Sequence, residues 1–517
     1  MKHLAILLSC SVGLSLLACG AAPPPAPAGP QPEPSSVTPS APPARAKDPL
    51  STAPASGITP NASFPTIARR TLASGLEIAV ISRKTLPIVE LRLLFHSGMA
   101  SDGNKPGVAV VAGELTKVGG AGPWNTEALL EHAESLGAAL NVLTDRDSTR
   151  ISLGVTTGDL DPALDILAAV AMKPRFDAKE FGKLRTREVE GARAAAKSSA
   201  GYAASMILYR ELFDVPTAIH PYSRYQALPE DLSKLTLADC KAWHKQHMTP
   251  KNAMLIATGD VDIDALAKTV ERAFAGWQGE KPEQPRFSEP MPDSERHLYL
   301  VDRPGSGQAQ VMVGRLGPER QTKDWPSLAI LNQVLGGGVA GRLFLDVREK
   351  RSLAYSTGSS LDEVAHGPVP IILSAGTQTN KAPHAVQALL DNLQRMSESP
   401  PTAAEIEMAS RYLSDSFLFR TETVGALADM TAKLSVLSLP DSYYDDYRKA
   451  VRSTDGPTAV KNAGKFFGTS QVVVVVAGDA EKLAQRLTHF SKVIVIDPQK
   501  SFTPGRMLPA NPSQALD

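Results

Sequence analysis

The chain has 517 residues, of which 43% are hydrophobic and 21% are charged, so it holds enough apolar material for two or more folded domains. Its 54 lysine and arginine residues balance 54 aspartate and glutamate residues. This balance argues against a nucleic-acid-binding protein, because such proteins usually carry a basic surplus. Of the three cysteines, only Cys240 lies in the body of the chain, which excludes an internal disulfide framework there.

Residues 1–19 have the pattern of a secretory signal. A short polar start precedes an apolar stretch at 4–18, which is too short for a typical membrane span. The stretch runs into Leu-Leu-Ala-Cys-Gly, which resembles a bacterial lipobox and predicts cleavage before Cys19 and a lipid on its thiol. An ordinary secretory peptide is the alternative. Since Gly20 favours outer-membrane sorting, we expect a protein of the bacterial cell envelope, lipid-anchored in the outer membrane and facing the periplasm.

Composition divides the rest of the chain. Residues 20–62 are rich in Pro, Ala and Ser, which cannot bury a core and favour extended conformations, so we expect a tether there. The remainder is predicted to contain an N-terminal domain at 63–280, a proline-containing linker at 281–294, a C-terminal domain at 295–506 and a tail at 507–517.

Two matched pairs of strand ends indicate an internal duplication. A continuous apolar run ends in Gly-Asp at Asp260, and a similar run ends in Gly-Asp at Asp479. A second strand pattern ends at Gly98 and again at Gly317, and the interval is identical to that between the two aspartates. In both copies a proline then opens an apolar helical run. A period this long predicts two homologous domains and excludes a solenoid of short repeats.

Each half mixes strands and helices. Residues 148–155 alternate in polarity as a half-buried strand does, and the closely spaced strand patterns before them predict antiparallel pairing. Helical patterns cover 161–172, 178–197, 384–397 and 403–420. This segregation predicts an α+β fold of two homologous halves, each a mainly antiparallel sheet packed with helices.

Several segments of the body resemble the pitrilysin/insulinase family of zinc peptidases, the inverzincins. These are Lys-Pro-Gly-Val-Ala at 105–109, Leu-Gly-Ala-Ala-Leu-Asn at 136–141, Thr-Asp-Arg-Asp-Ser-Thr at 144–149, His-Pro-Tyr at 220–222 and His-Met-Thr-Pro-Lys-Asn-Ala at 247–253. The resemblance covers residues 64 to about 500. It implies that the two halves form a clam-shell, with a chamber that admits short or unfolded peptides.

The zinc motif of that family, His-x-x-Glu-His, is absent. The family's lead-in places its five positions at 110–114, which read Val-Val-Ala-Gly-Glu, with Val110, Gly113 and Glu114 at the functional positions. The chemistry needs two imidazoles to bind Zn²⁺ and a carboxylate to accept a proton from the zinc-bound water. Valine and glycine can do neither, and one carboxylate is a weak metal site. Glu190 lies about where the family has its third zinc ligand, and on this interpretation it is a relic of that ligand. The simpler interpretation of Glu190 is a solvent-exposed helix residue.

The C-terminal half keeps the other signature of the family. There, an arginine and a tyrosine seven residues apart bind the substrate backbone and help to polarise the scissile carbonyl, and Arg348 and Tyr355 have this spacing. A guanidinium and a phenol are suitable fixed donors beside a developing oxyanion. Gly336, Gly337 and Gly338 would let a substrate strand approach the backbone closely. The alternative is a structural ion pair for Arg348 and a core position for Tyr355.

The resemblance therefore implies a non-catalytic subunit, inactive alone, that forms a heterodimer with a zinc-bearing homologue. Zinc is expected in that partner and no cofactor in this chain, which would contact the peptide substrate in trans. One alternative is an envelope binding or assembly protein without hydrolysis. Another is an autonomous metallopeptidase with an unorthodox metal site. The best pair of histidines for such a site is His244 and His247. A structural role for these two residues is the simpler interpretation.

Overall fold

The computed structural model of the chain describes residues 62–216, 218–291 and 297–516. The chain divides into two units, Met1–Thr59 and Pro60–Asp517, and the described residues all belong to the second unit. The expected signal peptide with Cys19, and the tether up to residue 61, lie outside the described residues. In the part that is described, no helix combines the length and the apolar character needed to cross a membrane.

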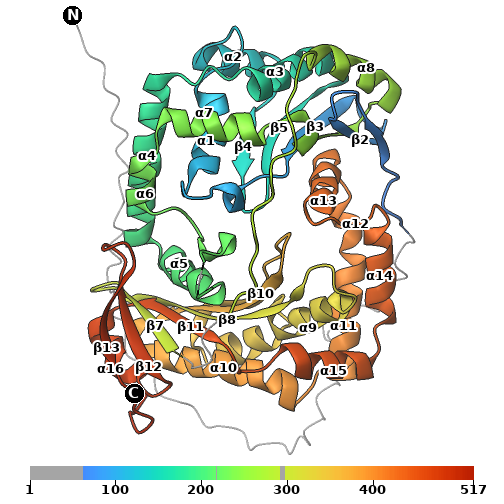
Figure 1. Ribbon diagram of the computed structural model, residues 1–517. Coiled ribbons are helices and arrows are strands. Elements are labelled where there is room, and N and C mark those ends of the chain that lie inside the picture. Colours follow the sequence, from blue (N-terminus) through green and yellow to red (C-terminus); the bar gives the residue numbers. More distant parts are fainter. Residues whose placement is uncertain (1–61, 217, 292–296, 517) are drawn as a thin grey trace, which may run out of the picture. The chain divides into compact units, whose positions relative to one another are not determined.

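A six-stranded sheet carries the N-terminal half, in the order β1-β2-β6-β3-β5-β4 (Figure 1). Its strands are β1 (Ala68–Thr71), β2 (Glu77–Ser82), β3 (Ile88–Phe95), β4 (Asn141–Thr144), β5 (Thr149–Thr156) and β6 (Ala253–Gly259). Neighbouring strands are antiparallel except for the parallel pair β2 and β6. The strand predicted at 148–155 is β5.

A seven-stranded sheet carries the C-terminal half, in the order β13-β12-β7-β11-β8-β10-β9. Its strands are β7 (His297–Asp302), β8 (Gln308–Glu319), β9 (Ala354–Leu361), β10 (Pro368–Gln378), β11 (Val473–Gly478), β12 (Lys492–Asp497) and β13 (Thr503–Leu508). In this sheet β7 pairs in parallel with both β11 and β12, and the other pairs that the structure describes are antiparallel. β13 enters the predicted tail, because Met507 and Leu508 pair with Ile494 and Val493 of β12.

The two sheets repeat one topology. The order β2-β6-β3-β5-β4 in the first corresponds to β7-β11-β8-β10-β9 in the second, and each series begins with its parallel pair. β5 begins at Thr149 and β10 at Pro368, an interval equal to the one that separates Gly98 from Gly317 in the sequence. The predicted α+β fold of two similar halves with mainly antiparallel sheets is therefore confirmed.

Helices surround both sheets. In the N-terminal half they are α1 (Val108–Val118), α2 (Thr126–Ser135), α3 (Leu160–Met172), α4 (Ala178–Ser198), α5 (Ala200–Leu212), α6 (Pro229–Lys234), α7 (Leu237–His247) and α8 (Ile263–Ala273). In the C-terminal half they are α9 (Trp325–Gly336), α10 (Ala382–Glu398), α11 (Ala403–Asp415), α12 (Phe417–Arg420), α13 (Val424–Val436), α14 (Tyr443–Ser453), α15 (Gly456–Phe466) and α16 (Ala480–Leu487). The helix predicted at 403–420 is interrupted at Ser416, a turn residue between α11 and α12.

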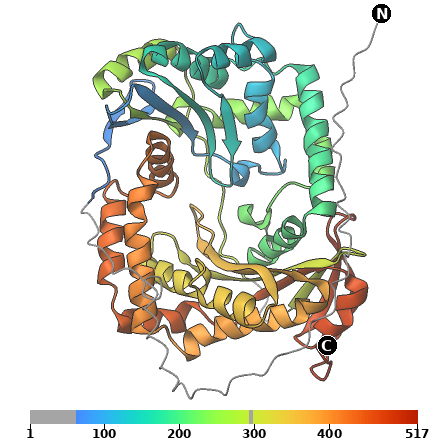
Figure 2. The same cartoon turned by 180° about the vertical axis from the view of Figure 1, so that it is seen from behind.

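The halves exchange one helix each. α5 packs against β8 and β11 of the second sheet, on the face opposite α10, and α13 packs against β3 and β6 of the first (Figure 1; Figure 2 shows the same arrangement from behind). The burial of β6 at every residue follows from this. Leu255 belongs to the core of its own half, whereas Ile256, on the other face, packs with Leu427 of α13. Each sheet therefore depends on the other half to cover one of its faces.

Candidate functional site

Arg348 and Tyr355 lie side by side on an exposed part of the second half. Arg348 belongs to a π-helical turn, Phe344–Lys350, and Tyr355 is the second residue of β9. The guanidinium carbon of Arg348 is 5.1 Å from the centre of the Tyr355 ring and 4.7 Å from that of Phe344. Tyr355 is 84% exposed, so it is not a core residue. The only ion pair of Arg348 within the described chain is a 3.5 Å contact with its neighbour Glu349, which leaves N–H donors available.

Buried Asp346 fixes the π-helical turn to α10. Its carboxylate accepts hydrogen bonds of 2.8 Å from both Asn392 and Arg395 of α10, and one of 3.2 Å from Arg351. Burial alone would raise the pKa of Asp346, but the Asn392 hydrogen bond and the two guanidinium charges hold that pKa below its usual value. After the turn, Ser352 has a φ of 49°, which is uncommon outside glycine. A pinned π-helical turn with local strain is a feature typical of functional sites.

The three glycines at the end of α9 and just after it differ in their surroundings. Gly336 is buried, and a Cβ atom there would lie 2.6 Å from the Ser359 nitrogen, so the packing of α9 against β9 requires glycine. A Cβ atom on Gly337 would lie 2.8 Å from the Cα atom of Gln333, whereas on Gly338 the nearest atom would be 3.3 Å away. The structure therefore gives Gly336 a packing role and leaves Gly337 and Gly338 exposed.

The positions of the degenerate zinc motif lie on α1 and do not fit a metal ion. Glu114 lies 3.1 Å from the Nζ atom of Lys117 and 3.6 Å from Arg187, so cations already neutralise its carboxylate. Glu190, on α4, is exposed and pairs with Arg193 at 2.7 Å. Nowhere in the described ranges do three or more His, Cys, Asp or Glu side chains gather as a metal site would require. The side chains at these positions therefore cannot supply the family's zinc chemistry.

His244 and His247 make separate structural contacts. The Nε2 atom of His244 is 2.9 Å from the Ala171 carbonyl, and the Nδ1 atom of His247 is 3.0 Å from the Ser97 hydroxyl. Burial lowers the pKa of each to about 4, so both rings are neutral at ordinary pH. The pair offers no support for a substitute metal site.

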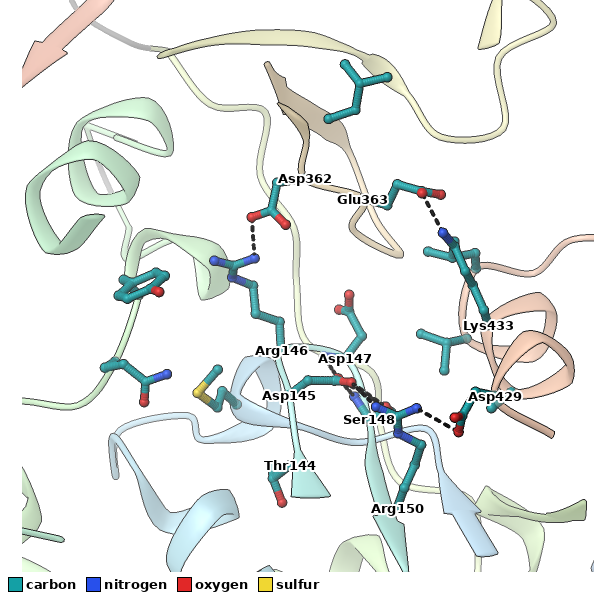
Figure 3. A pocket seen from close by; sticks show the side chains of 17 residues that line it. Thr144, Asp145, Arg146, Asp147, Ser148, Arg150, Asp362, Glu363, Asp429 and Lys433 are labelled. Atoms are coloured by element: carbon teal, nitrogen blue, oxygen red, sulfur yellow. Dashed lines mark hydrogen bonds and ion pairs between the residues drawn. The ribbon is translucent and has the colours of Figure 1, made fainter. Parts of the chain in front are cut away.

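A charged cavity of about 640 Å³ lies where the tips of two equivalent hairpins meet, β4–β5 from one half and β9–β10 from the other (Figure 3). Arg146 reaches Asp362 at 2.7 Å, and Lys433 of α13 reaches Glu363 at 2.5 Å. Arg146 and Asp362 lie far apart in the chain, so the sequence alone does not show that they meet. For this reason sequence analysis assigns these residues no function. The available signal is the run Asp-Arg-Asp at a hairpin tip.

Asp147 is the centre of the contact between the hairpin tips. Its carboxylate accepts a 2.5 Å hydrogen bond from the Tyr222 hydroxyl and a 3.0 Å hydrogen bond from the Ala365 amide. The Tyr222 hydroxyl in turn accepts a 3.2 Å hydrogen bond from the His366 amide. Burial raises the pKa of Asp147, although its hydrogen bonds with Tyr222 and Ala365 both act to lower that pKa. The two halves are therefore joined by polar contacts at the hairpin tips.

Family models match both halves. The model described as insulinase (peptidase family M16) matches residues 77–214, and the model described as peptidase M16 inactive domain matches residues 234–413, so the two together match more than half of the chain. The chain belongs to the M16 peptidase family. The resemblance to pitrilysin- and insulinase-type peptidases in the sequence is thereby confirmed. The inactive type of domain is the one matched at 234–413, from the last elements of the first half into the second.

Relatives in this family carry the name zinc protease. An uncharacterized zinc protease of Mycobacterium bovis is 28% identical over 318 residues, which is 61% of this chain and 70% of the relative. The zinc protease PqqE of Helicobacter pylori is 23% identical over 419 residues, which is 78% of this chain and 91% of the relative.

Solved structures of M16 proteins share the fold. A peptidase M16 inactive domain from Pseudomonas fluorescens is 24% identical and covers 80% of this chain and 98% of its own, with a TM-score of 0.72. A protease from Helicobacter pylori is 20% identical and covers 80% of this chain and 100% of its own, with a TM-score of 0.74. At this identity the likeness establishes the two-domain M16 fold. The side chains of this chain decide the rest: α1 lacks zinc ligands, whereas the Arg348–Tyr355 pair is present and exposed.

Proposed function

We propose that this M16 chain is the non-catalytic subunit of a zinc peptidase complex and holds peptide for cleavage by a zinc-bearing homologue. The observation that carries this proposal is the exposed pair Arg348 and Tyr355 on a pinned turn, in a chain whose motif positions cannot bind zinc. A pure scaffold has no use for two exposed donors fixed beside each other. The metal ion and the attacking water would belong to the partner.

The two side chains act as hydrogen-bond donors. The guanidinium carries five N–H groups, and the phenol of Tyr355 carries one O–H group. A carbonyl oxygen of the bound peptide can accept from both, and the hydrogen bonds strengthen as that oxygen gains negative charge in the transition state. The Asp346 network matters because donors that already hold their position need no reorganisation during the reaction.

The place of action follows from the N-terminal sequence. A lipid on Cys19 would anchor the complex in the outer membrane, and the Pro-rich segment 20–62 would hold the folded body away from the lipid surface on the periplasmic side. A peptide degraded there would come from the cell envelope or from outside the cell.

Peptide hydrolysis tests the proposal. Quenched random peptides are incubated with the full chain, with its zinc-motif homologue and with the mixture, and zinc is measured in each sample. We expect cleavage in the mixture alone and zinc in the homologue alone. In the mixture, Tyr355→Phe and Arg348→Ala should each lower kcat about 10²-fold, the effect of removing an oxyanion donor.

A matched control separates the donors from general charge effects. Arg272 is exposed on α8 and forms two long ion pairs of 3.4 and 3.7 Å, so Arg272→Ala should leave cleavage unchanged. Cleavage by this chain alone, with zinc bound, would overturn the proposal. Undiminished activity of the mixture with Arg348→Ala and Tyr355→Phe would do so as well.

A further inference from the structure

An apolar pocket of about 410 Å³ opens beside the exposed glycines, between the end of α9 and α11. Its walls include Val339 and Ala340 after the glycines, and Met408, Ala409 and Tyr412 on α11. Val339 is 71% exposed, Met408 51% and Tyr412 53%. Large apolar side chains that converge on a concave site and stay in contact with water favour a ligand that covers them.

The pocket offers no free charge to a ligand. Among its lining residues, the one side chain that is charged at neutral pH is Glu405, and Arg342 binds that carboxylate in a bidentate ion pair of 2.7 and 2.9 Å. The same carboxylate accepts a hydrogen bond from the Thr402 backbone at the start of α11, and these contacts hold the pKa of Glu405 at about 2. A charged ligand group would lose its hydration without gaining a partner, whereas an uncharged apolar group would bury surface on both sides.

The pocket is near the Arg348–Tyr355 site, because its lining residue Gly338 follows Gly336 by two positions. Gly336, at the end of α9, is packed against Ser359 of β9, and Tyr355 lies four residues earlier on the same strand. Four residues of extended chain span ~13 Å. An extended peptide that ran along β9 from Tyr355 toward Ser359 would therefore bring a side chain about four residues away close to the loop that carries Gly338 and the pocket.

We propose that this pocket binds one bulky apolar side chain, of the size of leucine or phenylalanine, from the peptide held by Arg348 and Tyr355. The inference rests on the proposed function and adds to it a substrate class: peptides with an apolar residue at a fixed distance from the cleaved bond. Gly337 and Gly338 have no side chains, so the peptide backbone could pass close to them between the Arg348–Tyr355 pair and the pocket.

Direct binding tests the assignment without the partner. Fluorescein-labelled ten-residue peptides of one Ser/Gly/Ala background, differing only by Leu, Phe, Ala or Lys at a single position, are titrated with the full chain, and Kd is read from anisotropy. The Leu and Phe peptides should bind at least about tenfold more tightly than the Ala peptide. The Lys peptide should bind no more tightly than the Ala peptide.

Two methionines provide a matched pair of variants. Met408→Lys places a charge in the pocket at an exposed position, so it should fold, as circular dichroism will check, and should abolish the advantage of Leu over Ala. Met507 of β13 is 55% exposed and lies outside the pocket, so Met507→Lys should leave that advantage intact. Arg348→Ala should weaken all the peptides by a similar factor.

The outcomes separate this inference from the proposed function. Equal affinity for Leu and Ala peptides, with all of them weakened by Arg348→Ala, overturns the pocket assignment alone. The same holds if Met408→Lys keeps the preference for Leu but blocks association with the zinc-motif homologue, because the face would then be a protein contact. Failure of every peptide to bind overturns both.

Discussion

Tyr222→Phe tests whether the polar contact between the hairpin tips holds the two halves together. The substitution removes one oxygen and keeps the ring, which packs against Phe213 and Phe287. It takes a donor from the half-buried carboxylate of Asp147 and an acceptor from the His366 amide. A hydrogen bond to a charged group contributes about 1.5–3 kcal/mol, so with the weaker amide contact we expect a loss of about 2–4 kcal/mol.

The assay has a global and a local part. Urea unfolding of the full chain gives the change in stability. Hydrogen exchange gives the protection of the His366 amide, which should fall tenfold for each loss of about 1.4 kcal/mol in local stability. Because the Tyr222 donor favours the ionised carboxylate, its loss raises the pKa of Asp147 further above its usual value. The loss of unfolding free energy in Tyr222→Phe should therefore be largest at pH values where Asp147 is ionised, and it should shrink as the pH falls and Asp147 is protonated.

Tyr225→Phe is the control, since the Tyr225 ring lines the same cavity and its hydroxyl makes no hydrogen bond within the described residues. It should change stability by less than about 0.5 kcal/mol. If Tyr222→Phe behaves like Tyr225→Phe, with unchanged exchange at His366, the hairpin contact does not stabilise the closed arrangement and the reasoning fails.

Two further predictions concern the loop after α9. Arg342→Ala should cost about 1–2 kcal/mol at neutral pH, because its partly exposed ion pair with Glu405 is lost. Since the folded pKa of Glu405 is about 2, its contribution is present above pH 4.5 and is lost as the pH falls through about 2, so acid unfolding curves of variant and parent should converge there. Gly336→Ala should destabilise the fold by about 1–3 kcal/mol through contact with Ser359, whereas Gly338→Ala should be nearly neutral in thermal unfolding.

Sequence patterns predict the elements of this fold well where the signal is local. The alternation at 148–155 specifies β5, and the continuous apolar run before Asp479 specifies β11, because the side-chain period follows from backbone geometry. The two equal intervals between matched strand ends predict the repeated topology. The apolar pattern of a helix indicates that one of its faces is buried, but not which sheet that face contacts. The exchange of α5 and α13 between the halves therefore cannot be predicted from the sequence.

The candidate site shows the same division. The spacing of Arg348 and Tyr355, together with the family resemblance, predicts their proximity, since a turn and the start of a strand separate them by only seven residues. The support from Asp346 depends on residues of α10 more than 40 positions away. The contact of Asp147 with Ala365 joins the two halves of the repeat. Such long-range polar contacts leave no periodic trace in a single sequence.

The exchange of helices imposes an order on the synthesis of this protein. The first sheet is complete in sequence at Gly259, but α13, which covers one of its faces, begins at Val424. At about 5–20 residues per second, a growing chain would leave that face uncovered for roughly 10–30 seconds. Leu94 and Ile256 on this face are apolar and would be open to other chains during that time. We therefore expect a chain that stops before α13 to aggregate, even though all the strands of its first sheet are present.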